Sequence, residues 1–127
     1  MDNNQRVFEQ IDRLFKSINS EPKRFYGSDW SEWKDGSTGG QTYPCVYILW
    51  QDEKSNIPSY VGETENLGKR LYDHDKSTGW TQPRWQYVQY LTDESLKDGE
   101  FRGLFEAFCI YIMKPKDNNA RRKVFNK

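Results

Sequence analysis

Two short runs of β-branched and aromatic residues, CVYILW at 45–50 and IPSYVG at 57–62, constrain the fold more than any other feature. The stretch between them, QDEKSN, is polar and charged, and this order predicts a β-hairpin. Side chains alternate between the faces of a strand. A hairpin centred in the middle of the charged stretch therefore sets Tyr47 opposite Tyr60, and Gly62 leaves the surface beside the two phenols open. Packing alone also explains such an aromatic pair.

The rest of the chain alternates between helical and strand-like patterns. We expect a helix at 5–19, a polar irregular segment at 20–43, a helix at 65–76 entered through Thr64 as N-cap, a strand at 85–91, and a mostly buried helix at 99–113 that stops before Pro115. This order predicts a small α+β domain with a three-stranded antiparallel sheet flanked by helices and with an extra N-terminal helix. One compact unit is expected, with 1–43 as the N-terminal helix and irregular extension and 44–127 as the main domain.

Composition excludes several classes of protein. Aliphatic residues are few, but the aromatic residues (16% of the chain) supply burial, and the 19 basic and 19 acidic residues balance. Two cysteines are too few for a disulfide framework or a four-thiolate zinc site, and one histidine excludes a multi-histidine metal centre. No apolar run is long enough to span a bilayer, and the polar start is not a signal peptide. We therefore expect a cytoplasmic protein without a membrane partner.

The helix expected at 65–76 carries two candidate functional side chains. A rotation of about 100° per residue places Arg70 and His74 on or beside its apolar stripe, so both point toward the body of the protein. An arginine in that position needs an anion, and its planar fork suits a phosphate or a carboxylate. A structural salt bridge for Arg70 and a hydrogen-bonded interior role for His74 are equally open.

Glu106 is the only charged residue in the stretch 103–113, GLFEAFCIYIM. Burying a carboxylate without a partner is costly, so such a group holds a cation or a specific set of hydrogen bonds. Magnesium accepts one or two carboxylates together with waters and phosphate oxygens. A pair with Arg70 would satisfy both side chains and is the alternative.

The last segment, 114–127, has six basic residues and one acidic residue, which gives it a net charge of +5. A solvated tail explains this charge. Together with Lys69 and Arg84 the segment could instead contact a phosphate backbone.

The order of these features resembles the GIY-YIG nuclease family. The resemblance rests on CVY…YVG, ETENLGKRLYDH and LFEAFCIYIMKPKDN, and it covers residues 44–119. It implies a central three-stranded antiparallel sheet flanked by helices and a metal-dependent endonuclease that hydrolyses DNA phosphodiester bonds, with Mg²⁺ or Mn²⁺ as cofactor. Cys45 departs from the pattern because it replaces the first motif glycine, and Glu63 adds a negative charge next to the second.

The resemblance also assigns roles to individual residues. The catalytic positions fall on Tyr47, Tyr60, Arg70, His74, Glu106 and Asn118, with Glu106 as the metal ligand and Asn119 as the neighbouring alternative to Asn118. Substrate contacts are expected from Gly62, Lys69, Arg84 and Lys116. DNA is then the expected partner, and both a monomer and a homodimer fit. The competing hypothesis is a catalytically silent nucleic-acid-binding module, or a subunit of a larger nuclease complex.

Overall fold

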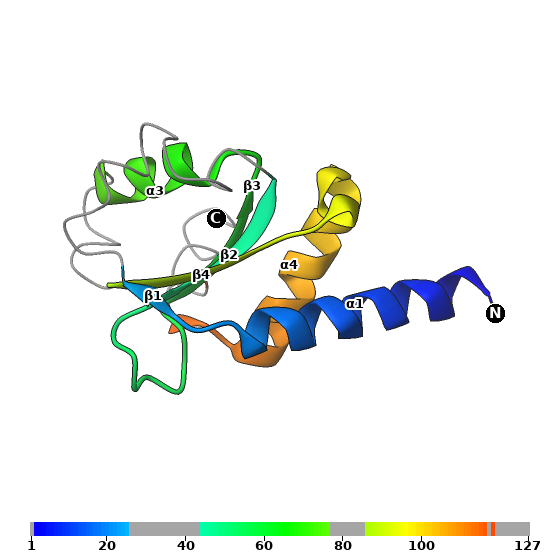
Figure 1. The fold of residues 1–127 in the computed structure, drawn as a ribbon, viewed down its shortest axis with the longest axis horizontal. Helices are drawn as coiled ribbons and strands as arrows, with labels where there is room; N and C mark the ends of the chain where they lie inside the picture. The colour runs from blue at the N-terminus through cyan, green and yellow to red at the C-terminus, as the bar shows by residue number, and fades with distance from the viewer. Residues whose placement is uncertain (1, 26–43, 77–85, 117, 119–127) are drawn as a thin grey trace, which may run out of the picture.

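The computed structural model describes residues 2–25, 44–76, 86–116 and 118, without the side chains of Phe25 and of 72–76. Its elements are α1 (Asn3–Ser20), β1 (Arg24–Phe25), β2 (Cys45–Trp50), β3 (Tyr60–Thr64), α3 (Leu67–Lys76), β4 (Tyr87–Thr92), the short 3₁₀ helix η2 (Glu94–Lys97) and α4 (Gly99–Met113), as Figure 1 shows. The predicted order of helices and strands is confirmed. None of the helices described is long and apolar enough to cross a membrane.

The strands form one antiparallel sheet in the order β1-β4-β2-β3. The three predicted strands are confirmed as its main part, and β1 is an addition that the sequence did not reveal. It pairs Arg24 with Val88 and Phe25 with Tyr87 at the edge of β4. Two residues are too short to show the alternation that marks a strand, so this segment was expected to be irregular.

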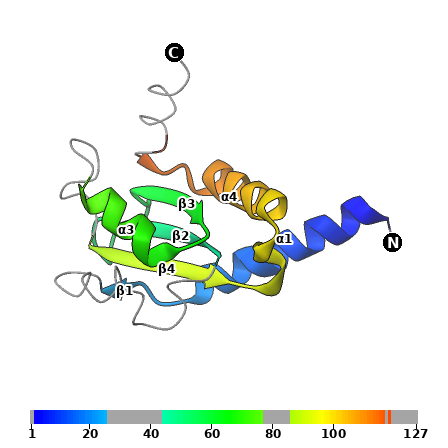
Figure 2. The same ribbon diagram turned by 90° about the horizontal axis from the view of Figure 1, so that it is seen from above.

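The sheet lies between two layers of helices, with α3 on one face and α1 and α4 on the other (Figures 1 and 2). Every residue of β2 is buried, because alternate side chains enter opposite hydrophobic clusters. Val46, Ile48 and Trp50 pack with residues of α1 and α4. Tyr47 and Leu49 face α3 with Leu67 and Leu71, so the central strand holds both layers together.

The predicted register of the β2–β3 hairpin is wrong by two residues. Tyr47 lies opposite Gly62, and Tyr60 lies opposite Leu49. The Ser59 N–H donates to the carbonyl of Leu49 at 2.7 Å, so the connecting loop is centred further along the chain than the charged stretch suggests. A shift of two residues keeps each side chain on its face. The two phenols therefore still share a surface, as diagonal rather than direct neighbours.

Two expectations about the helices also need correction. Thr64 belongs to β3, and the side chain of Asn66 caps α3 instead by accepting the Lys69 N–H at 3.1 Å. Helix α4 is not mostly buried. Its Leu104, Tyr111 and Ile112 are 48%, 76% and 48% exposed, because the helix contacts the body along one side only.

Candidate active site

The two motif tyrosines pack against each other above Gly62. The ring centroids of Tyr47 and Tyr60 are 5.9 Å apart, with the rings tilted by 38°. A Cβ added to Gly62 would lie 2.6 Å from Tyr47 Cζ, from its hydroxyl oxygen and from Tyr60 Cε2. The space beside the glycine is thus filled by the phenols and is not the open surface predicted above. Glycine is required here because any side chain would displace one ring.

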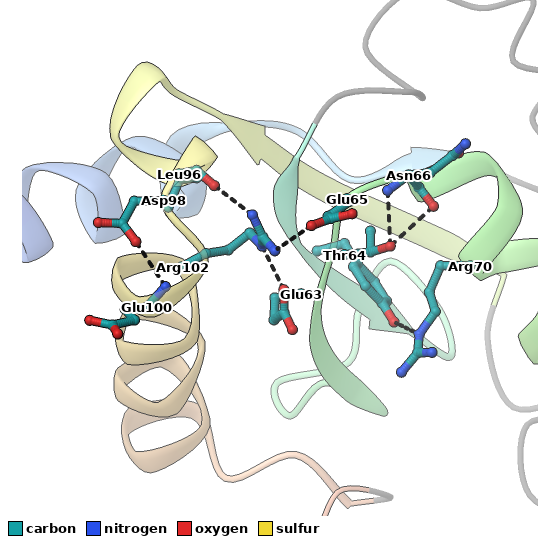
Figure 3. A network of polar contacts seen from close by, with 10 residues as sticks. Glu63, Thr64, Glu65, Asn66, Arg70, Leu96, Asp98, Glu100 and Arg102 are labelled. Atoms are coloured by element: carbon teal, nitrogen blue, oxygen red, sulfur yellow. Dashed lines mark hydrogen bonds and ion pairs between the residues drawn. The ribbon is translucent and has the colours of Figure 1, made fainter.

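Arg70 connects this pair to helix α3. Its Nε donates to the hydroxyl of Tyr47 at 3.4 Å, and the side chain is half-buried (Figure 3). The arginine therefore points toward the body of the protein, as its helical position predicts. Burial opposes the positive charge, but the oxygens of Tyr47 and Tyr60 attract it more strongly, so the pKa of Arg70 is raised above its ordinary value. The guanidinium remains charged at any pH at which the protein is folded.

The hydroxyl of Tyr47 lies in a low-dielectric setting. The residue is fully buried, and burial raises its pKa well above the ordinary value of a phenol, with a further increase from Tyr60. Arg70 acts in the opposite direction through its charge and its hydrogen bond, without reversing the shift. The chain by itself therefore holds Tyr47 as a neutral phenol.

A cleft of about 440 Å³ lies on the solvent side of Arg70. It is lined by Thr64, Glu65, Asn66, Lys69 and Arg70. Lys69 is exposed in this cleft, whereas Glu65 adds a negative charge. Arg70 thus joins a buried phenol to an open cleft.

Helix α4 is tied to β3 by a buried arginine, Arg102, which no sequence pattern singles out. The Nε of Arg102 donates to Glu63 Oε2 at 2.5 Å, and its Nη1 donates to the carbonyl of Leu96 at 2.9 Å (Figure 3). The side chain is 7% exposed, whereas that of Glu63 is 34% exposed. Arg102 immediately precedes the stretch 103–113. The acid next to the motif glycine thus pairs with α4.

Glu106 follows Arg102 by four residues, about one turn, on α4. In Figure 3, α4 runs alongside β3 in the opposite direction, with Arg102 next to Glu63. The side chain of Glu106 is partly exposed, between two positions of α4 that are fully buried, Phe105 and Cys109.

Asn118 closes the outer edge of β3. Its Oδ1 accepts the Val61 N–H, and its Nδ2 donates to the Val61 carbonyl, both at 2.8 Å. The N–H of Lys116, whose side chain is exposed, donates to the carbonyl of Pro58 at 3.1 Å. Both ends of the amide hold the chain after α4 against the strand that carries Tyr60. An additional role in orienting Glu106 stays a prediction.

Three of the predicted site residues lie outside what the structure describes. They are His74, which belongs to α3 but whose side chain is not described, together with Arg84 and Asn119.

At the first motif position, burial raises the pKa of the Cys45 thiol to about 12. This cysteine therefore stays protonated and serves the core.

Donor chemistry decides which metal ion the site can hold. Glu106 offers hard carboxylate oxygens, and among the described residues no group of three or more histidine, cysteine, aspartate or glutamate side chains could hold a metal. A zinc site closed by protein ligands therefore does not fit these residues. An ion that keeps most of its waters, as magnesium does, fits a single carboxylate.

Comparison with known proteins supports the resemblance found in the sequence. Residues 43–88, which include the hairpin, α3 and the start of β4, match the family model described as the GIY-YIG catalytic domain. The resemblance to the GIY-YIG family is confirmed. The match also supports the predicted enzyme class, because this family model describes a catalytic domain.

A solved structure shows the same GIY-YIG fold. The GIY-YIG N-terminal endonuclease domain of UvrC from Thermotoga maritima, bound to its catalytic divalent cation magnesium, superposes with a TM-score of 0.50 at 18% identity, over 67% of this chain and 93% of that one. A variant of that domain with one tyrosine replaced by phenylalanine gives a TM-score of 0.49 at 19% identity, with coverages of 67% and 93%. No curated protein sequence matches the chain. At these identities the likeness concerns the fold.

Proposed function

We propose that this protein is a metal-dependent endonuclease that hydrolyses DNA phosphodiester bonds. The observation that carries the proposal is Arg70, which contacts a buried motif tyrosine and also lines an open cleft. The match of residues 43–88 to a nuclease catalytic domain supports it, as does the divalent cation named for the similar UvrC domain. The substrate is proposed to enter beside α3, with its reacting phosphate at Arg70.

Each chain residue has a distinct task in this mechanism. Arg70 donates hydrogen bonds to the non-bridging phosphate oxygens, where negative charge increases in the transition state. Tyr47, as a phenolate, accepts the proton of the attacking water and returns to the phenol, assisted by Tyr60 or His74. A phenol with a raised pKa is a poor base in its neutral form, so this task requires positive charge beyond that of Arg70. Glu106 would hold the metal ion, and Asn118 keeps β3 in place.

Magnesium or manganese bound at Glu106 would supply that charge and stabilise the leaving 3′ oxygen. The requirement is tested with supercoiled plasmid DNA. We expect conversion to nicked and linear forms in magnesium buffer and no conversion with EDTA, followed on an agarose gel. Restoration by excess magnesium distinguishes metal removal from loss of protein. Cleavage that persists with EDTA would contradict the metal requirement.

The role of the buried phenol is tested by Tyr47→Phe. The ring and its packing remain, but the hydroxyl that contacts Arg70 is lost. We expect nicking to fall by about 10²-fold or more, which is the usual contribution of a positioned acid–base group. Tyr111→Phe is the matched control, since Tyr111 is 76% exposed on α4 and should keep full activity. Full activity of the Tyr47→Phe variant would transfer the role to Tyr60 or His74.

A catalytically silent binding module is the second candidate. Two features favour it: burial raises the pKa of Tyr47, and Glu65 lies in the cleft with Lys69 and Arg70. Such a module would bind DNA in the presence of magnesium without converting the plasmid. The nicking assay together with a binding measurement on the same preparation separates the two functions.

A further inference from the structure

The edge strand β1 lies outside the segment that matches the catalytic domain, yet it contributes to the face of the sheet that carries the motif tyrosines. Arg24 of β1 is paired directly with Val88 of β4. Side chains of directly paired residues project from the same face of a sheet. Val88 packs in the cluster that contains Tyr47 and Tyr60, so Arg24 shares their face. Its side chain is exposed.

Tyr90 holds the guanidinium of Arg24 in place. The Nη1 of Arg24 donates to the Tyr90 hydroxyl at 2.8 Å, and the guanidinium carbon lies 4.9 Å from the centroid of the Tyr90 ring. The hydrogen bond and the contact with the ring together restrain the orientation of the guanidinium and its distance from the sheet. Tyr90 is paired directly with Tyr47 across β4 and β2. The phenol that holds Arg24 is therefore the immediate neighbour of the proposed catalytic phenol.

Two arginines consequently flank Tyr47 on one face of the sheet. Arg70 reaches it from α3, and Arg24 lies toward the opposite edge, beyond β4. Neighbouring strands are about 4.8 Å apart, so β1 lies about 10 Å from β2. A guanidinium carries five N–H donors, and the contact with Tyr90 uses one of them. The remaining fork matches the geometry of a phosphate.

We propose that Arg24, held by Tyr90, binds a backbone phosphate of the DNA next to the phosphate that reacts at Arg70. The assignment rests on the proposed function, since it extends the same substrate across the sheet. It also provides a positively charged contact to DNA in a chain whose net charge is zero. The N-terminal extension then contributes to substrate binding as well as to the core.

The test is DNA affinity measured by fluorescence anisotropy over a series of salt concentrations. The probe is a short labelled DNA duplex of mixed sequence, and Glu106→Gln is present in every protein so that the probe stays intact. Arg24→Gln is expected to weaken binding by about tenfold or more, as a charge-assisted hydrogen bond implies. It should also reduce the slope of log Kd against log salt by about one, because one phosphate contact is lost.

Two further variants separate a phosphate contact from a structural role. Arg24→Lys keeps the charge and should retain the salt slope of the parent. Arg6→Gln is the matched control, since Arg6 is exposed on α1, which covers the other face of the sheet, and neither affinity nor slope should change. Melting temperatures of all variants are compared, and a slope that falls for Arg24→Gln but not for Arg24→Lys at equal folding supports the proposal.

The possible failures are distinguishable. Unchanged affinity and slope for Arg24→Gln, in a background that binds the probe, would overturn the Arg24 site and leave the nuclease proposal intact. An equal loss of slope in Arg6→Gln would overturn it as well, because the effect would then be one of total charge. A parent protein that neither binds the duplex nor nicks plasmid DNA would overturn the proposed function and the site with it.

Discussion

Plasmid nicking by Arg70→Ala and by Glu106→Ala is expected to fall at least about a hundredfold below that of the parent chain. Arg70 is the one cation shown to contact the motif tyrosine in the described part of the chain, so its loss removes both the proposed phosphate contact and the charge beside the phenol. Glu106 is the proposed metal ligand, and alanine has no oxygen to replace it. Initial rates in magnesium buffer measure both effects.

A matched control shows whether these losses are local. Glu100→Ala removes a carboxylate from the exposed first turn of the same helix, α4, and should keep parental activity. Circular dichroism and melting temperatures establish that the variants fold. Parental nicking by a folded Arg70→Ala variant would contradict the role of the arginine as the phosphate contact. Parental nicking by Glu106→Ala would place the metal on another residue.

Glu63→Gln is expected to lower the free energy of unfolding by about 3 kcal/mol. The guanidinium of Arg102 is almost completely buried, and Glu63 is its close charged partner, whereas Glu65 is 3.9 Å away and largely exposed. Removing the charge of Glu63 leaves a buried cation with a carbonyl and a distant carboxylate. Urea unfolding, followed by circular dichroism, measures the loss.

Glu94→Gln makes the same chemical change in an exposed pair. Glu94 contacts Lys97 at 3.0 Å, with side chains 86% and 58% exposed, so the cost should stay below about 1 kcal/mol. The double variant Glu63→Gln/Arg102→Met removes both charges and should recover most of the stability. A Glu63→Gln variant as stable as Glu94→Gln would show that the pair contributes no more than a surface contact.

The sequence predicted the main strands because their patterns are local. β-branched and aromatic residues dominate 45–50 and 85–91, and the last helix ends just before Pro115, as predicted. The register of the hairpin, in contrast, could not be predicted from the residues of the two strands alone. It depends on how far the loop extends before Ser59 joins Leu49, and the polar stretch between the strands does not specify that length.

The candidate site was predictable in part for the same reason. The identities of Tyr47, Tyr60, Arg70 and Glu106 follow from motif order, and the helical period correctly turns Arg70 toward the body. The contacts of Arg102 with Glu63 and of Arg24 with Tyr90 join residues 39 and 66 positions apart. No periodicity links such pairs, because each depends on how separate elements pack.

By itself the sequence determined the main strands and helices, which face of each is apolar, and which chemical groups the candidate site contains. These properties depend on neighbours within a few positions along the chain. Only the tertiary structure decided that the phenols fill the space above Gly62, that α4 leaves one side exposed, and that β1 brings an arginine to the tyrosine face. Those outcomes come from packing between distant segments, whose relative positions are set by the volume of the core and by hydrogen bonds across the sheet.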